Sequence, residues 1–140
     1  MDSHPVEQVP APEEIPGGDT IFRRIPRSLM SAGKPDAGAF RNATEDYAEP
    51  GMSVLWEKYA RAEDCLALTG ATPADSVAAL NAAKIREIED QMIIHVPKAL
   101  RADGGRAHSE VYGLKPAWVT KRLRELAVLA IQGPDKARAP

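Results

Sequence analysis

The chain has 140 residues, 44% of them hydrophobic and 27% charged, with a formal net charge of −2. Such a length and composition are those of one soluble domain with one hydrophobic core. There is no run of about 18 apolar residues, and the start "MDSHPVEQVPAPEE" is acidic and broken by proline, unlike a secretory signal. We therefore expect a cytosolic protein without a membrane span. Cys65 is alone, which excludes an intramolecular disulfide, and we expect it to be a small buried hydrophobe.

Composition separates both ends of the chain from its middle. Residues 1–18 hold four prolines, two glycines and four acidic residues, but no Lys, Arg or aromatic residue. Such a segment cannot bury enough apolar surface to offset the entropy of ordering, so we expect a flexible acidic leader. Residues 133–140 begin with Gly-Pro and are expected to form a second flexible tail. One folded domain is therefore predicted over residues 19–132.

Basic residues gather in two segments of this predicted domain. Without the four acids of the leader, the chain has 18 basic and 16 acidic residues, a net charge of +2. Residues 98–124 carry seven Lys and Arg against Asp103 and Glu110, and residues 20–34 carry four basic residues and no acid. If the two segments share a face, that face attracts phosphates or an acidic partner surface. The alternative is that they are the solvated faces of separate elements.

The first half of the domain is predicted to contain a strand and a helix. "TIFRRIP" at 20–26 has three β-branched residues and a closing proline, as short strands do. "GMSVLW" at 51–56 follows a proline and is either a second short strand or the entry to a helix. Apolar residues then repeat at helical spacing from Leu55 to Leu66, before a glycine, which predicts a helix over about residues 55–68.

Residues 72–90 have two interpretations. "TPAD" has the cap, the proline and the acid that open a helix. Four residues at helical spacing then favour one helix over residues 73–90: Val77, Leu80, Lys84 and Ile88. In the alternative, "SVAAL" is a strand and Asn81 caps a short helix that follows it.

The second half is predicted to contain two strands and a helix. "MIIHVP" at 92–97 and "HSEVYGL" at 108–114 are the strands, with the glycine-rich turn "RADGGR" between them. "PAWVTKRLRELAVLAIQG" at 116–133 has one apolar stripe, which predicts an amphipathic helix with Trp118 packed beneath it. The predicted fold class is therefore α+β, a single compact domain with a small mixed or antiparallel sheet and a packed C-terminal amphipathic helix.

Three stretches, "FRRIP", "GMSV" and "AHSEVYGLK" followed by a basic amphipathic helix, resemble a group of small uncharacterised bacterial proteins. The resemblance covers about residues 20–130, and the loop "KPDAG" departs from it because it lacks the serines of the group. It implies that "SVAALN" is a strand and agrees with the α+β class. It implies no activity, because none is established for the group. The matched positions are Arg23, Arg24, Phe40, Ser53, His108, Val111, Gly113 and Lys115.

The stretch "HSEVY" is the first candidate for a site. On a strand, His108, Glu110 and Tyr112 point to one side, where the histidine and the carboxylate form a proton-transfer pair and the tyrosine is a donor. Arg23 or Arg24 from a neighbouring strand supplies an anion clamp in this hypothesis. The same alternation of polar residues is also typical of the half-exposed face of an ordinary strand.

A second histidine and a lysine complete the candidates. His95 has apolar neighbours, as core histidines do. It would meet His108 if the two strands paired as a hairpin around "RADGGR", and two histidines, one base and one acid, are what an RNA-processing site needs. Lys115, just after the second strand, joins Arg23 and Arg24 as a predicted anion-binding residue.

The sequence leaves two classes of function open. No metal site or cofactor is predicted, because Cys65 and His4 are isolated and no carboxylate cluster has the spacing of a metal loop. The first hypothesis is a small cytosolic bacterial interaction module without enzymatic activity, which binds a protein partner through its basic face or its leader. The second is an RNA- or nucleotide-directed enzyme that performs phosphodiester or nucleotide chemistry with histidines and an arginine clamp. Charge also leaves nucleic-acid binding open, although few aromatic residues are there to stack on bases.

Overall fold

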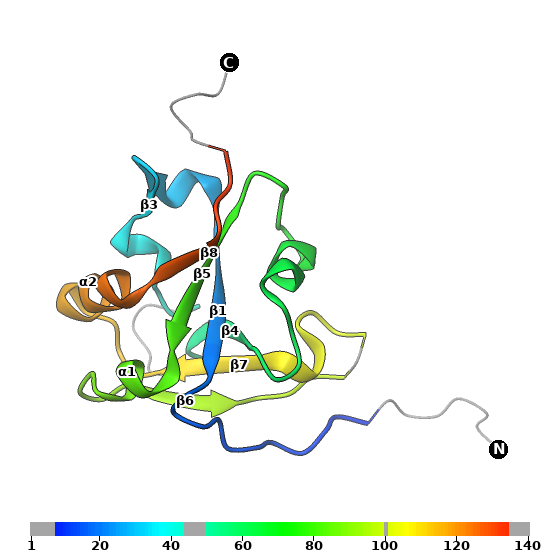
Figure 1. Ribbon diagram of the computed structural model, residues 1–140. Coiled ribbons are helices and arrows are strands. Elements are labelled where there is room, and N and C mark those ends of the chain that lie inside the picture. The colour runs from blue at the N-terminus through cyan, green and yellow to red at the C-terminus, as the bar shows by residue number, and fades with distance from the viewer. Residues whose placement is uncertain (1–7, 44–49, 100, 135–140) are drawn as a thin grey trace.

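Six strands form one antiparallel sheet in the computed structural model, which describes residues 8–43, 50–99 and 101–134 (Figure 1). Across the sheet the strands follow the order β6-β7-β4-β1-β5-β8. With two helices, the second near the C-terminus, the sheet makes a single α+β domain, which confirms the predicted class. The strands of the sheet are β1 (Thr20–Ile25), β4 (Met52–Trp56), β5 (Ser76–Asn81), β6 (Met92–His95), β7 (His108–Tyr112) and β8 (Val128–Ile131).

The remaining elements are short and lie outside this sheet. Helix α1 spans Ala82–Arg86 and helix α2 spans Ala117–Leu126. Two-residue strands β2 (Met30–Ser31) and β3 (Lys34–Pro35) pair with each other only. Within the described ranges no helix is long and apolar enough to cross a membrane. The 3₁₀ helices are η1 (Arg27–Leu29), η2 (Ala37–Ala39), η3 (Ala62–Ala67) and η4 (Gly105–Ala107).

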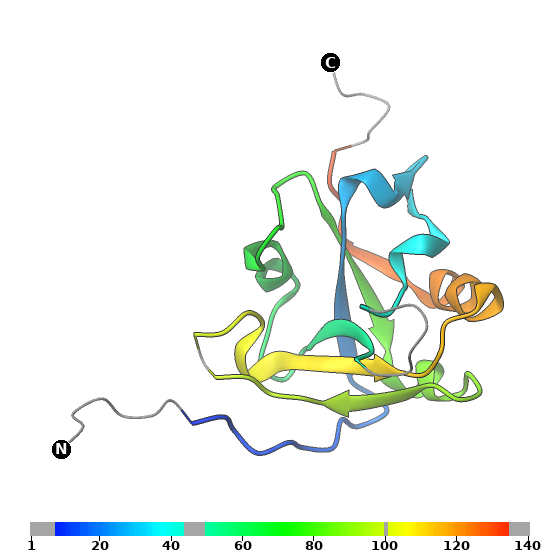
Figure 2. The same cartoon turned by 180° about the vertical axis from the view of Figure 1, so that it is seen from behind.

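The sheet is strongly bent where β1 meets β4. Strand β1 pairs with β5 along all six of its residues. It pairs with β4 only at two positions, Ile21 opposite Trp56 and Phe22 opposite Leu55, and the two strands part beyond that point. In both views β1 and β5 run across the direction of β6 and β7 (Figures 1 and 2). The bend therefore divides the sheet into two halves, β8-β5-β1 and β4-β7-β6.

Both faces of the bent sheet are covered, but by cores of different size. Because side chains alternate along a strand, Ile21 and Trp56 point into the larger core, which α2 and the N-terminal segment cover. Leu55 and Val77 point to the opposite face, where a smaller cluster lies beneath η3 and includes the buried Cys65. The burial of Cys65 confirms the prediction made for it from the sequence.

Local structure differs from the predicted helices in the middle of the chain. The helix expected over residues 55–68 is absent: β4 extends to Trp56, and only the 3₁₀ helix η3 follows. Leu55 is a sheet residue, paired with Phe22 on one side and His108 on the other, so its helical spacing is coincidental. Of the two interpretations of residues 73–90, the strand β5 followed by a short helix is the observed one. Asn81 caps that helix, since its Oδ1 accepts the Lys84 N–H at 3.0 Å.

The C-terminal helix is shorter than predicted. Helix α2 ends at Leu126, and residues 128–131 form β8, which pairs with β5. The apolar run "AVLAI" continues the helical stripe in the sequence, but the free backbone groups on the outer side of β5 are satisfied by an added strand. Trp118 is 55% exposed and so does not pack beneath the helix as expected.

The N-terminal segment from residue 8 lies against the domain, in contrast to the flexible leader expected over residues 1–18. Ile15 is buried in the larger core with 2% of its surface exposed. The Glu13 backbone N–H donates to His95 Nδ1 at 2.9 Å, and the Glu13 carboxylate accepts hydrogen bonds from Lys58 and Tyr59. Polar contacts and one buried isoleucine thus hold a segment that is poor in apolar residues. Residues 1–7 of the expected leader lie outside the described residues, as do residues 135–140 of the expected tail.

Replacement of Ile15 tests this attachment. Ile15→Ala should lower the free energy of unfolding by about 3 kcal/mol, because it removes buried methyl groups from the core. Urea unfolding followed by circular dichroism measures the loss. Val9→Ala is the matched control, because Val9 is 59% exposed, and it should change stability by less than about 0.5 kcal/mol. Equal unfolding midpoints for the two variants would show that the segment is not part of the core.

Candidate functional site

The register of three neighbouring strands places His108 beside β1. Leu55 on β4 is opposite Phe22 on β1 and opposite His108 on β7. Directly paired residues share a face of the sheet, so these three side chains lie on the same face. Arg24, two residues after Phe22, belongs to that face too. A histidine and an arginine that are far apart in the sequence are thereby brought to one surface.

A cavity of about 290 Å³ opens on this face of the sheet, between the strands and the loops that hold Thr69 and Lys98. Its volume is near the lower end of the range for small-molecule sites, about 300–1,000 Å³. It is lined by side chains from both basic segments of the sequence, which therefore share this surface at least in part. We call it the cleft, and its lining is Phe22, Arg23, Arg24, Pro26, Leu29, Ser53, Val54, Leu55, Leu68, Thr69, Lys98, Asp103 and His108.

His108 is held in one orientation in the wall of the cleft. The residue is 6% exposed, and its Nδ1 lies 2.9 Å from the Val96 carbonyl oxygen. A carbonyl only accepts, so Nδ1 carries the proton and Nε2 is left with the lone pair in the neutral ring. Burial lowers the pKa of His108 below its ordinary value of 6.5; the positive charge of Lys98 acts in the same direction, and the bond to Val96 in the opposite one. At neutral pH this imidazole is therefore a proton acceptor.

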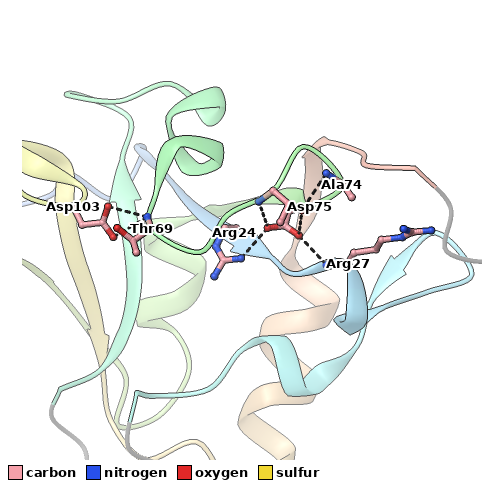
Figure 3. Close-up of polar contacts among 7 residues, drawn as sticks. Arg24, Arg27, Thr69, Ala74, Asp75 and Asp103 are labelled. Atoms are coloured by element: carbon pink, nitrogen blue, oxygen red, sulfur yellow. Dashed lines mark hydrogen bonds and ion pairs between the residues drawn. The ribbon is translucent and has the colours of Figure 1, made fainter. Parts of the chain in front are cut away.

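Arg24 is anchored in the cleft by a buried carboxylate. Its Nη1 donates to Asp75 Oδ2 at 2.9 Å, and the Asp75 side chain is 4% exposed. Asp75 also accepts the backbone N–H groups of Arg27 and Thr72, so it ties the end of β1 to the loop before β5. Figure 3 shows the Arg24 guanidinium between Asp75 on one side and the Thr69–Asp103 pair on the other. The guanidinium keeps further N–H donors beyond the one that Asp75 accepts.

Arg23 fills the space where β1 and β4 part. Its Nη1 donates to the Ser53 carbonyl at 2.9 Å and its Nε to the Ala39 carbonyl at 3.2 Å. Within the described ranges it forms no ion pair. Burial lowers the pKa of Arg23 to about 10, and the neighbouring charge of Arg24 adds to that shift. Two adjacent guanidinium groups, of which Arg24 is paired with the Asp75 carboxylate, leave an excess of positive charge beside the cleft.

At the opposite rim of the cleft, a polar contact joins two loops. The Thr69 backbone N–H donates to both oxygens of Asp103, at 3.0 and 3.1 Å (Figure 3). This contact joins the loop after η3 to the loop before η4. Lys98 lines the cleft from the chain between β6 and η4. With Asp75 counted, three cationic side chains thus face two carboxylates in and around the cleft, Arg23, Arg24 and Lys98 against Asp75 and Asp103.

His95 lies on the other face of the sheet. The expected hairpin of β6 and β7 forms, but it pairs His95 with Ser109, so His95 and His108 point to opposite faces. His95 is 2% exposed, its Nδ1 accepts the Glu13 N–H, and its Nε2 lies 2.7 Å from the Arg106 carbonyl oxygen. Its ring packs edge-on to Trp56 with centroids 4.9 Å apart. His95 is therefore a core residue that fastens the N-terminal segment, and the sheet separates it from His108.

Glu110 and Tyr112 share the face of His108 but lie outside the lining of the cleft. Glu110 is 9% exposed, and its Oε1 accepts the Gly51 N–H at 2.8 Å. A side chain on Gly51 would come within 2.2 Å of the Val111 carbonyl oxygen, so only glycine permits this approach of β4 to β7. Strand β7 is buried on both faces over its first four residues. The half-exposed strand that the sequence offered as the alternative is therefore not what forms here.

Lys115 occupies a separate place beyond the end of β7. Its Nζ donates to the Val111 and Gly113 carbonyls at 2.9 and 2.7 Å. Burial lowers the pKa of Lys115 to about 8, and the charge of Arg23 contributes. It lines a different cavity, of about 690 Å³, at the start of α2. The three predicted anion-binding residues are thus divided: Arg23 and Arg24 are at the cleft and Lys115 is not.

The sequence did not mark Lys98, Thr69 and Asp103, three polar residues of the cleft, as site residues. Lys98 belongs to the basic segment that the composition revealed, but nothing marked it among seven basic residues. Thr69 and Asp103 lie in loops 34 positions apart, and no local pattern links such loops. Among the described residues no group of three His, Cys, Asp or Glu side chains is placed to hold a metal ion. A comparison of the chain with models of protein families, with curated proteins and with solved structures finds no match.

Substitution of Asp75 tests the anchor of Arg24. Burial raises the pKa of Asp75, but hydrogen bonds from Thr72, Arg24 and Arg27 outweigh that effect and hold it below its ordinary value of 3.8. A lowered folded pKa stabilises the fold above the unfolded value, and this contribution is lost as the pH falls below about 3.8. Asp75→Asn should therefore lose about 2 kcal/mol at pH 7.

The pH dependence distinguishes this role from a general loss of packing. In urea unfolding between pH 3 and 7, wild type should lose stability more steeply towards pH 3 than Asp75→Asn. Glu125→Gln on the exposed face of α2 is the control and should keep the wild-type profile. Parallel profiles for wild type and Asp75→Asn would contradict the anchoring role.

Proposed function

We propose that the cleft binds a small phosphate-bearing ligand and that His108 is the proton acceptor in a reaction of that ligand. This proposal retains the arginine clamp and one histidine of the nucleotide-directed enzyme hypothesis. It drops His95, which lies on the other face of the sheet. The observation that carries it is the convergence of Arg24, Lys98 and His108 on one small cavity.

The charge of the cleft supports an anionic ligand. Arg23 has no carboxylate partner among the described residues, and burial already lowers its pKa to about 10. The charge of Arg24 lowers the pKa of Arg23, and the charge of Lys98 lowers the pKa of His108. An anion in the cleft would offset this repulsion, because charge-assisted hydrogen bonds from guanidinium and ammonium groups are stronger than neutral ones. Phosphate is the anion that such a combination of arginine and lysine favours.

The protonation state of His108 supports a catalytic role more than a role in the electrostatic attraction of an anion. A cationic histidine would add to the binding of an anion, but this ring is held neutral and keeps its lone pair on Nε2. A neutral imidazole next to bound phosphate accepts a proton from a water molecule or a ligand hydroxyl as that oxygen attacks the phosphorus. The P–O bond to the leaving group breaks in the same displacement, and the leaving oxygen departs into solvent, which protonates it where needed. Since the Val96 carbonyl fixes the other nitrogen, the acceptor is oriented before the ligand arrives.

Loss of Lys98 should weaken the binding of anions. Lys98→Gln is expected to weaken the binding of inorganic phosphate roughly tenfold, the loss of one charge-assisted hydrogen bond of about 1.5 kcal/mol. Isothermal titration calorimetry measures the affinity. NMR titration of His108 is the second readout, because removal of the Lys98 charge should raise the His108 pKa. Lys121→Gln on α2 should change neither quantity, and an unchanged His108 pKa in Lys98→Gln would contradict the site.

Loss of His108 should abolish turnover and leave binding in place. With bis(4-nitrophenyl) phosphate as the probe, His108→Gln is expected to reduce turnover at least about 100-fold, the lower range for general acid–base catalysis. In wild type the rate should be constant near neutral pH and fall as His108 becomes protonated, below its ordinary value of 6.5. A variant as active as wild type would contradict the role of His108, and a wild type without turnover would restrict the proposal to binding.

The hypothesis of a protein-binding module stays a prediction. In that hypothesis the partner binds the basic face or the leader. Trp118 and Leu114, which are 55% and 53% exposed at the start of α2, are apolar side chains that would add to such a contact. These two side chains lie outside the lining of the cleft, so a partner bound there would leave the cleft open, whereas a partner on the basic face would compete with a phosphate-bearing ligand.

A further inference from the structure

We infer that the ligand of the cleft is a nucleoside phosphate, with its base against Phe22 and Leu68 and its phosphate at Arg24 and Lys98. This inference rests on the proposed function, since it names the class of ligand for the same site. It depends on the distribution of apolar, cationic and acidic side chains within the cleft and on its volume. The apolar and the acidic side chains each argue against a different group of phosphate-bearing compounds, and the volume argues against a nucleic acid chain.

The apolar part of the lining excludes small phosphates as the complete ligand. Phe22 is the aromatic side chain of the lining, and Leu55 and Leu68 extend the apolar surface around it. Inorganic phosphate or a sugar phosphate would leave this surface in contact with water. A ligand that covers it carries a flat apolar group, and the ring of a nucleobase stacks on an aromatic side chain with a gain of about 1–3 kcal/mol.

The acidic part of the lining favours a ligand with hydrogen-bond donors over phosphorylated lipids and simple aryl phosphates. Asp103 is exposed at the rim, where its carboxylate accepts the Thr69 N–H with both oxygens. A carboxylate accepts up to about four hydrogen bonds, so capacity remains after that contact. It repels a second anion but accepts from hydroxyl or amino groups. Ribose hydroxyls and the amino groups of bases are such donors, whereas an acyl chain or a plain phenyl ring has none.

The size of the cleft favours a mononucleotide over a nucleic acid chain. Its volume of about 290 Å³ is that of a small-molecule site. Single-stranded nucleic acids are bound on grooves in which several aromatic side chains stack successive bases. Among the described residues, Phe22 is the one Phe, Tyr or Trp of this lining, so one base is what it accommodates.

Calorimetric titration of the full chain with a graded series of probes tests the inference. The probes are inorganic phosphate, ribose 5-phosphate, the four nucleoside 5′-monophosphates and a hexameric oligoribonucleotide. At least one nucleoside monophosphate should bind about tenfold tighter than ribose 5-phosphate, the gain that stacking of a base supplies. This comparison uses wild-type protein only, so it does not depend on the folding of any variant.

Two variants test whether the tenfold gain in affinity comes from the apolar side chains Phe22 and Leu68. Phe22→Leu keeps an apolar side chain but removes the aromatic face, and it should abolish most of the tenfold gain while ribose 5-phosphate binds within about twofold of wild type. Leu68→Ala, at a half-buried position after η3 and outside the sheet, should reduce the gain as well. Trp118→Leu is the matched control for loss of an exposed aromatic residue, and it should bind every probe like wild type.

The outcomes separate this inference from the proposal on which it rests. If ribose 5-phosphate binds and Lys98→Gln weakens it, but no nucleoside monophosphate binds more tightly, the nucleoside assignment is overturned and the phosphate site stands. If none of the probes binds, both are overturned. If only the oligoribonucleotide binds, with an affinity that falls steeply with salt, the ligand is a nucleic acid chain and the inference is again overturned.

Discussion

The parting of β1 from β4 after Phe22 is the constraint on which the rest of this structure depends. Neighbouring strands satisfy each other's backbone groups, so a parting leaves carbonyls that need other donors. Arg23 supplies one of them: its guanidinium reaches the Ser53 carbonyl in place of a backbone N–H of β1. The opening then has room for side chains of both halves of the sheet, and the cleft lies there. The Arg23 side chain thus supplies a hydrogen bond that a backbone N–H supplies in a regular pair of strands.

Because side chains alternate between the two faces of a sheet, His95 on β6 and His108 on β7 lie on opposite faces and have different roles. His95 has both ring nitrogens in contact with backbone groups and stacks among aromatic residues, so it is part of the core. His108 has one nitrogen bound to a carbonyl and lies in the wall of the cleft. Burial and the charge of Lys98 lower the pKa of His108, so its ring is neutral at neutral pH. Carboxylates serve mainly as anchors around it, with Asp75 holding Arg24 and Glu110 holding the start of β4.

Sequence patterns predicted the elements where local and tertiary preferences agree. Strands β1, β6 and β7 were readable from β-branched residues and bounding prolines or glycines, and each is observed. Parts of three predicted helices, over residues 55–68, 73–90 and 116–133, are strands instead, because apolar residues at helical spacing also suit a buried sheet when a neighbour offers unpaired backbone groups. Leu55 in β4 and Leu129 in β8 are such residues, each paired across the sheet. Residues of the candidate site were partly predicted, since His108, Arg23 and Arg24 carry groups whose chemistry is visible without a structure.

By itself, the sequence determined the α+β class, the two segments rich in basic residues, the burial of Cys65 and the types of side chain available for chemistry. These follow from composition and from short-range periodicity, which the chain carries in every conformation. Tertiary structure alone decided that His108 meets Arg24 and Lys98, that His95 does not, and that Asp103 closes the rim. The physical reason is that strand register and loop contacts join residues tens of positions apart, and a shift of one residue in register would reverse every face.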